Sequence, residues 1–181
     1  MKFEALPLKG AWLISPDVFS DDRGWFARAY CKDDFKRIGH AKEWVQINHS
    51  FTEKKGTLRG MHFQNKPYSE IKLIRCISGA VFDVIVDIRK DSETFLKWYG
   101  TEISAANKKM IYVPEGFAHG FQALENNSEL IYHHSEFYKK EAEAGLNFSD
   151  ELLKISWPLP INNISERDKN HPFLTTTFKG I

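Results

Sequence analysis

The chain has 181 residues, and its 42% hydrophobic and 14% aromatic content excludes a disordered or low-complexity protein. Its 25 Lys and Arg residues offset 24 Asp and Glu residues to a net charge of +1, which argues against a nucleic-acid partner bound through bulk positive charge. Two cysteines are too few for a disulfide scaffold or a cysteine-based zinc site, and the length predicts a single domain.

Residues 1–50 are predicted to form N-terminal strands and an arm. Glu4 falls where a signal peptide would need apolar residues, and no apolar run in the chain approaches the ~18 residues that span a membrane. We therefore expect a soluble cytoplasmic protein with no membrane partner. The best helical signal covers residues 32–42, where Asp33 and Asp34 can cap a turn.

Residues 51–135 are predicted to form the core of a barrel of short strands. In residues 81–88 every even-numbered position is apolar and the opposite face includes Asp83 and Asp87, which is typical of a sheet with one polar side. The other predicted strands, separated by Gly, Pro and Asn, cover residues 71–77, 98–103, 109–113, 117–124 and 129–134. This spacing, with almost no helix between strands, predicts an antiparallel sandwich or barrel, around which residues 136–181 wrap as an ordered loop.

Residues 58–64 carry the densest set of candidate site residues. If this segment is a strand, Gly60, His62 and Gln64 share one face while Arg59 takes the other, and Gly60 leaves room beside the imidazole. A core histidine that bonds to Gln64 explains the pattern equally well.

Two later strands also place polar groups on apolar faces. Lys72 shares a face with Ile74, and an inward lysine is costly unless it is paired or functional. An edge strand with Lys72 in solvent is the alternative. Tyr132 shares a face with Leu130 and His134, although a buried tyrosine is most often structural.

Residues 114–121 contain the spacing Pro-x-Gly-x-x-His, which resembles the second motif of the cupin superfamily and places His119 in a strand. Metal cupins supply a His-x-His pair and a Glu from a first motif, where this chain has His62, Gln64 and Glu70. An amide is a poor ligand for zinc or iron, so we predict no metal site.

Six signatures taken in order resemble the dTDP-4-dehydrorhamnose 3,5-epimerase family, a metal-independent branch of the cupins. The resemblance covers about residues 12 to 168, and the signatures lie at residues 22–24, 58–64, 81–89, 114–121, 132 and 164–168. The resemblance implies an all-β, cupin-type jelly roll or antiparallel barrel with a few short helices. Residues 1–181 would form one domain, with the N-terminal arm at 1–50, the barrel core at 51–135 and the C-terminal wrap at 136–181.

The resemblance also implies an isomerase that inverts C3 and C5 of a nucleotide-linked 4-keto-6-deoxyhexose through an enolate. His62 would be the base, with Asp168 as the carboxylate that orients its ring. Lys72 would stabilise the enolate oxygen, and Tyr132 would return the proton from the other side. No cofactor is expected, because the ketone itself activates the neighbouring protons.

The family's binding positions are matched as well. Arg23, Arg59 and Arg167 correspond to cationic positions around the diphosphate, where guanidinium suits bidentate contacts. The other matched positions are Gln46 and Asn48 at the nucleotide, Tyr138 stacked on the base, Glu143 at a further contact and His119 at the sugar. A homodimer with an exchanged N-terminal segment is implied, in which Arg23 acts across the interface.

The chain departs from the family's pattern at two places. Arg28 stands where typical members have an acidic residue that contacts the nucleotide, so either the base is not thymine, Arg28 adds a phosphate contact, or Arg28 turns to solvent. His133 and His134 follow Tyr132 where a Lys and small polar residues are common. Alternatives to the double epimerase are therefore a single-site epimerase, a related 3,4-ketoisomerase, and a metal-binding or sugar-binding cupin.

Overall fold

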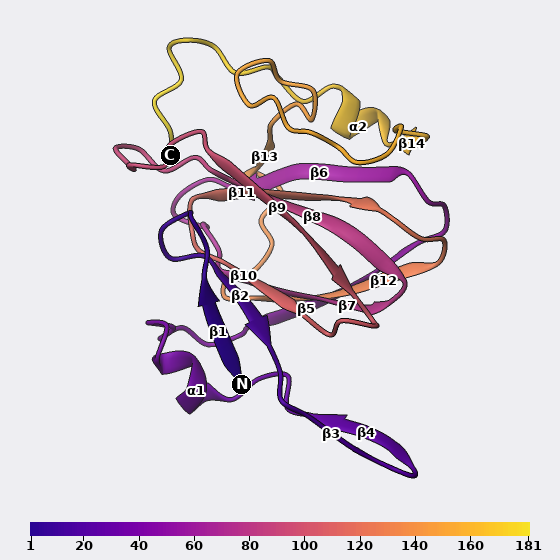
Figure 1. The fold of residues 1–181 in the computed structure, drawn as a ribbon. Coiled ribbons are helices and arrows are strands. Elements are labelled where there is room, and N and C mark those ends of the chain that lie inside the picture. Colours follow the sequence, from indigo (N-terminus) through magenta and orange to yellow (C-terminus); the bar gives the residue numbers. More distant parts are fainter.

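The computed structural model describes residues 1–181, whose regular secondary structure consists mainly of antiparallel strands (Figure 1). The N-terminal half contains β1 (Lys2–Ala5), β2 (Trp12–Ser15), β3 (Val18–Asp21), β4 (Gly24–Ala27), α1 (Lys32–Lys36), β5 (Gln46–Thr52), β6 (Thr57–Gln64), β7 (Lys72–Ser78) and β8 (Ala80–Asp87). The C-terminal half contains β9 (Trp98–Ser104), β10 (Met110–Val113), β11 (Phe117–Ala123), β12 (Ser128–His134), β13 (Glu143–Gly145), β14 (Asn163–Ile164) and α2 (Glu166–Lys169). The predicted all-β class with a few short helices is confirmed. Neither helix is long or apolar enough to cross a lipid bilayer.

Two sheets face each other across the main core. The first has the strand order β1-β2-β10-β7-β12-β5, and the second has the order β13-β6-β11-β8-β9, with β14 added beside β6. Apolar side chains from both sheets fill the space between them, among them Leu13, Ile74 and Leu130 from the first and Val81 and Ile85 from the second. Burying these aliphatic faces is the main force that holds the sheets together.

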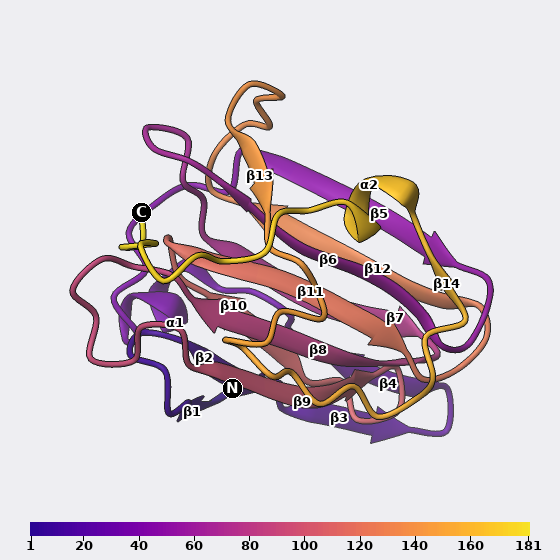
Figure 2. The same ribbon diagram turned by 90° about the horizontal axis from the view of Figure 1, so that it is seen from above.

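The C-terminal segment covers the outer face of the second sheet (Figure 2). Leu146, Leu153 and Trp157 from this segment pack against Val84 and Val86 of β8. Strand β8 is therefore buried on both faces, including the side that carries Asp83 and Asp87.

The two aspartates of β8 are buried because each has a charged or polar partner. Asp83 Oδ2 lies 2.9 Å from His119 Nε2, and Asp87 Oδ2 lies 2.7 Å from Arg89 Nη2. These contacts replace part of the hydration that each carboxylate loses on burial, although Asp83 Oδ1 has no hydrogen-bond partner.

Helix α1 is shorter than predicted. It ends at Lys36 instead of continuing to residue 42, and a turn follows in which Gly39 adopts a φ of +81°. The Phe35 carbonyl accepts from the His40 N–H, so the last turn closes on itself. Phe35 is fully buried against Tyr112, which fixes the helix to the outer face of the first sheet.

Strands β6 and β11 approach very closely where Gly60 faces Gly120. A Cβ on Gly60 would lie 2.5 Å from the Gly120 Cα, so no larger residue fits there. The register shifts at this point: His62 pairs with His119, but Arg59 pairs with Phe121. The extra residue in β6 changes the side-chain alternation. Arg59 and His62 consequently face the same cavity, and the prediction that they take opposite faces is wrong.

Replacing Gly60 tests how much this close approach contributes to stability. We expect Gly60→Ala to lower the free energy of unfolding by about 1–3 kcal/mol more than Gly24→Ala, because the added methyl group collides with backbone. Gly24 is the matched control, since its φ of +129° resembles the +135° of Gly60 and a Cβ there meets nothing within 4 Å. Urea unfolding measures the free energy of unfolding of both variants. Equal losses would show that β6 and β11 can move apart at no cost in stability.

Candidate active site

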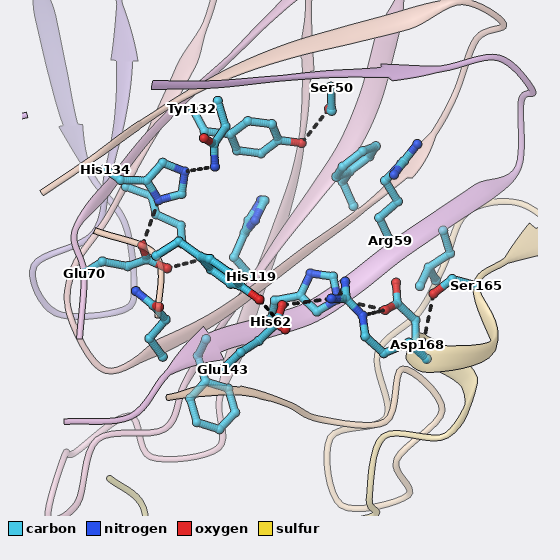
Figure 3. A pocket seen from close by; sticks show the side chains of 18 of the residues that line it. Ser50, Arg59, His62, Glu70, His119, Tyr132, His134, Glu143, Ser165 and Asp168 are labelled. Atoms are coloured by element: carbon cyan, nitrogen blue, oxygen red, sulfur yellow. Dashed lines mark hydrogen bonds and ion pairs between the residues drawn. The ribbon is translucent and has the colours of Figure 1, made fainter. Parts of the chain in front are cut away.

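A cavity of about 640 Å³ opens between the two sheets and reaches the C-terminal segment (Figure 3). Strands β5, β7 and β12 of the first sheet form one wall, β6 and β11 of the second sheet form the other, and α2 closes one end. All predicted site residues line it except Arg23 and Arg28. The volume lies in the range of pockets that hold small-molecule ligands.

His62 and Asp168 form the most constrained pair in the cavity. His62 Nε2 lies 2.9 Å from Asp168 Oδ1, while Asp168 Oδ2 accepts from the Gly60 N–H at 3.1 Å. The Asp168 side chain is only 3% exposed and is placed by α2, whose N-terminal Ser165 caps the Asp168 N–H. A proton on Nε2 forms a hydrogen bond to the carboxylate. Nδ1 of His62, with its free lone pair, is then the basic atom.

The charge of Asp168 is fixed by its neighbours. Burial by itself would raise the pKa of Asp168, but the hydrogen bond and the charge of the His62 ring, together with the Gly60 N–H, hold that pKa well below its ordinary value. Asp168 is therefore anionic at any working pH.

Lys72 is buried and paired, so the interpretation as an exposed edge-strand lysine is wrong. Strand β7 lies between β10 and β12, and Lys72 Nζ lies 3.1 Å from Glu70 Oε1. Glu70 Oε2 lies 2.8 Å from His134 Nδ1. Burial acts to raise the pKa of Glu70, but the His134 hydrogen bond and the Lys72 charge lower it overall. The buried Lys72 thus lies beside a carboxylate that its neighbours keep anionic.

Tyr132 enters the cavity from β12, on the wall opposite His62. Its hydroxyl lies 3.0 Å from Ser50 Oγ of β5, and its ring meets that of His119 edge-on at 6.2 Å. Burial raises the pKa of Tyr132 well above its ordinary value. The phenol therefore keeps its proton at neutral pH and can act as a donor.

His119 is held deeper in the cavity by a carboxylate of the neighbouring strand. Its Nε2 donates to Asp83 Oδ2 at 2.9 Å, and both side chains are buried. The contact joins β11 to β8 and fixes the orientation of the ring.

Polar and cationic groups surround the mouth of the cavity. Arg59 donates to the Phe51 carbonyl, and Arg167 bridges Glu143, at 2.9 Å, and Asp168, at 3.3 Å. Glu143 also accepts from the hydroxyl of the exposed Tyr138 at 3.0 Å. Gln46 and Asn48 extend this polar rim along β5.

Arg23 and Arg28 lie outside the cavity of their own chain. Arg23 is at the tip of the β3–β4 hairpin, where its side chain is 85% exposed and paired with Asp21 (Figure 1). Arg28 follows the hairpin and borders a small surface depression near Asp34.

Comparison with known proteins agrees with this geometry. The family model described as dTDP-4-dehydrorhamnose 3,5-epimerase matches residues 5–176. The chain belongs to this family. A dTDP-4-dehydrorhamnose 3,5-epimerase of Shigella flexneri is 45% identical over 159 residues, which are 87% of each chain.

Solved structures extend the similarity to the fold, and the cupin-type jelly roll is confirmed. The Bacillus anthracis dTDP-4-dehydrorhamnose 3,5-epimerase, with TDP and pyrophosphate bound, superposes with a TM-score of 0.93 at 39% identity and covers 96% of this chain and 99% of its own. A 3'-monoepimerase of Streptomyces bikiniensis, in complex with dTDP-quinovose, superposes with a TM-score of 0.87 at 32% identity over 93% of this chain and 85% of its own. Like its relatives, the chain is an isomerase of the epimerase type.

The donor atoms of a metal cupin do not converge in this epimerase. Gln64 is occupied by the backbone of the 137–139 segment, where its Oε1 accepts from the Lys139 N–H at 2.7 Å. Glu70 is engaged by Lys72 and His134, as described above. A different group, His62, Asp168 and His171, has its donor atoms within 4.8 Å of one another, but the Arg167 guanidinium lies 3.3 Å from both His62 and Asp168 and opposes a cation there.

Sequence reasoning missed the partners of the predicted residues. From the sequence, Asp83 is expected only on the polar side of a strand and Glu70 only at a metal-ligand position, and no local signal marks Ser50 or His171. His134 had a usable signal, because the alternation of β12 places it on the same face as Tyr132. The other residues meet their partners only because of strand pairing and loop placement, and neither leaves a pattern in the local sequence.

The lowered pKa of Asp168 predicts how stability responds to acid. A carboxylate whose pKa is depressed by folding stabilises the protein above the ordinary pKa of about 3.9, and that contribution is lost as the pH falls towards the folded-state pKa. The free energy of unfolding of the wild type should therefore fall between pH 5.5 and pH 3 by about 1 kcal/mol or more beyond the fall in Asp168→Asn. Denaturant titrations at the two pH values measure it. Asp22→Asn, at an exposed carboxylate, is the control, and parallel curves for all three proteins would contradict the assignment.

Proposed function

We propose that this chain inverts C3 and C5 of a dTDP-linked 4-keto-6-deoxyhexose by removing and returning the protons beside the C4 ketone. The observation that carries the proposal is the placement of a base and an acid on opposite walls. His62 comes from β6 of one sheet and Tyr132 from β12 of the other. A sugar ring between them would present opposite faces to the two groups, which is what inversion requires.

His62 is the base in this proposal. Asp168 holds the Nε2–H, so Nδ1 can take the proton from carbon, and the anionic carboxylate stabilises the imidazolium that forms. The anchoring of Asp168 by the Gly60 N–H keeps the ring in one orientation, so little reorganisation is needed during proton transfer.

Lys72 stabilises the negative charge that develops on the C4 oxygen. An ammonium ion in a partly dry cavity interacts more strongly with an enolate oxygen than it would in water. The Glu70 carboxylate offsets the desolvation cost of the buried ammonium group before substrate binds.

Tyr132 delivers the new proton to carbon from the opposite face. Its raised pKa keeps it protonated until the carbanion forms, and Ser50 fixes the direction of the hydroxyl. His119, held by Asp83, would contact the sugar beside it.

The mouth of the cavity is suited to the nucleotide. Arg59 and Arg167 provide guanidinium groups for the diphosphate. Gln46, Asn48 and the exposed Tyr138 ring would contact the nucleoside, with Glu143 beside them.

We further propose a homodimer in which the β3–β4 hairpin of one subunit reaches the cavity of the other. The hairpin projects from the body in Figure 1 and exposes large apolar side chains, with Phe19 and Phe26 each 68% exposed. Ile47 and Phe51 of the edge strand β5 are also exposed. Such surfaces support burial against a second copy, with Arg23 acting across the interface. The cytoplasmic location stays a prediction.

A single-site epimerase is the second candidate. It is favoured by the similarity to the 3'-monoepimerase of Streptomyces bikiniensis and by the His133-His134 pair after Tyr132. The same experiment separates the two, because it identifies each carbon that exchanges its proton.

Incubation with a dTDP-linked 4-keto-6-deoxyhexose in heavy water tests the function and both roles. NMR should show deuterium entering C3 and C5 with the wild type and no exchange with His62→Ala. Tyr132→Phe should still exchange protons but should lose most of the inverted product, because a proton returned by His62 restores the starting configuration.

Three results would contradict these assignments. Exchange by His62→Ala at a rate near that of the wild type would remove His62 as the base. An unchanged yield of inverted product from Tyr132→Phe would remove Tyr132 as the acid. If CDP, UDP or GDP bound tighter than dTDP in calorimetry, and Arg28→Glu reversed that order, the nucleotide assignment would be wrong and Arg28 would be its determinant.

Mixed dimers test whether Arg23 acts across the interface. Arg23→Ala and His62→Ala should each have little activity at low substrate concentration. Co-expressed chains that pair at random should recover about a quarter of the wild-type activity, because half of the dimers then contain one complete site. The absence of recovery would place Arg23 in the site of its own chain or outside any site.

A further inference from the structure

A continuous chain of hydrogen bonds links the mouth of the cavity to Lys72. The Tyr138 N–H donates to Gln46 Oε1 at 3.0 Å, and Gln46 Nε2 donates to Asn48 Oδ1 at 3.1 Å. Asn48 Nδ2 lies 3.2 Å from His134 Nε2, and His134 Nδ1 lies 2.8 Å from Glu70 Oε2 (Figure 3). Glu70 Oε1 then meets the Lys72 ammonium group at 3.1 Å.

Every link in this chain has a defined direction. The backbone N–H of Tyr138 can only donate, which orients the Gln46 amide, and Gln46 in turn orients the Asn48 amide. Asn48 therefore presents its NH₂ group to His134 Nε2, which has to be an acceptor without a proton. The single ring proton of His134 is on Nδ1, from which it is donated to Glu70.

The direction of the chain decides the roles of the two His134 ring nitrogens. A second proton on His134 would set an N–H against the Asn48 NH₂ group, and relieving that contact would require both amides to turn and would leave the Tyr138 N–H facing a donor. The hydrogen bonds therefore assign Nδ1 of His134 as the donor to Glu70 and Nε2 as the acceptor from Asn48. Each Glu70 oxygen then has one partner, with Oε1 beside Lys72 and Oε2 beside His134.

We propose that His134 is a positioning residue that holds Glu70, and through it the Lys72 ammonium group, in place for catalysis. The inference rests on the proposed function, since it assigns Lys72 to the enolate oxygen. Without the Nδ1–H of His134, the Glu70 carboxylate would turn both oxygens to Lys72 and draw the ammonium group away from the sugar. The other side of the ring serves a different purpose, because Nε2 fixes Asn48 at the nucleotide end.

Two substitutions separate the two sides of the ring. In His134→Asn, the amide NH₂ can occupy the place of Nδ1 and donate to Glu70, but nothing reaches Asn48. In His134→Gln, the longer amide places an acceptor near the position of Nε2, which keeps the Asn48 contact and loses the donor to Glu70. Both variants carry a primary amide, and they differ in side-chain length and therefore in which contact survives.

We expect the two variants to change different kinetic constants. His134→Gln should lower kcat by about tenfold or more with KM within about twofold, because the positioned charge is lost while nucleotide contacts remain. His134→Asn should keep kcat within about threefold and should raise KM. If His134 had only a structural role, the two substitutions would change kcat and KM alike. Equal kcat values for the two variants, or an unchanged kcat in His134→Gln, would overturn the proposal.

NMR separates failure of this inference from failure of the proposed function. With ¹⁵N-labelled histidine, the wild type at pH 7.5 should show His134 as the Nδ1–H tautomer. With ¹⁵N-labelled lysine, the Lys72 ammonium resonance should move in His134→Gln but not in His134→Asn. A wild type that turns over no 4-keto sugar would remove the proposed function while these spectra still decide the inference. A doubly protonated or Nε2–H ring, or an unmoved Lys72 resonance in His134→Gln, would overturn it.

Discussion

The carboxylate of Asp168 connects the fold of this protein to its chemistry. One oxygen lies 2.9 Å from His62 Nε2 and the other accepts from the Gly60 N–H, both on β6. The same residue sits in α2, within the segment that covers the second sheet. A buried anion requires such partners, so the contact holds the C-terminal segment to β6 and orients the His62 ring at once. The covering segment is thereby part of the site.

The cavity contains three such pairs of a histidine and a carboxylate. Each of three histidines faces a carboxylate from another element: His62 faces Asp168, His119 faces Asp83, and His134 faces Glu70. Every carboxylate fixes which ring nitrogen carries the proton, so the opposite nitrogen has a defined role. Chemistry that moves protons between carbon and side chains depends on such fixed tautomers, and the two rigid sheets supply the distances.

The paired charges also explain why the cavity stays open and polar inside an apolar sandwich. Between the sheets, aliphatic residues such as Ile74 and Val81 exclude water and hold the walls at a fixed separation. Lys72 and Glu70 form an ion pair at the cavity wall, so neither charge is buried without a partner. Approach of β6 to β11 at Gly60 adds the register shift that turns Arg59 and His62 to the same side.

Alternation of apolar residues, with turn residues between the runs, determined the strands of the barrel core and placed Tyr132 and His134 on one face. The same period of two left open whether Lys72 points inward. Motif spacing determined the family. Tertiary structure alone decided which residues meet, because cross-strand register and covering segments are set by parts of the chain far away. The burial of Asp83 depends on a partner from β11 and on a cover from the C-terminal segment, and neither is encoded in the alternation of β8. Arg59 faces the same cavity as His62 because β6 has one extra residue in the ladder, at the point where two glycines pack closely. A pattern that assumes regular pleating does not include this extra residue.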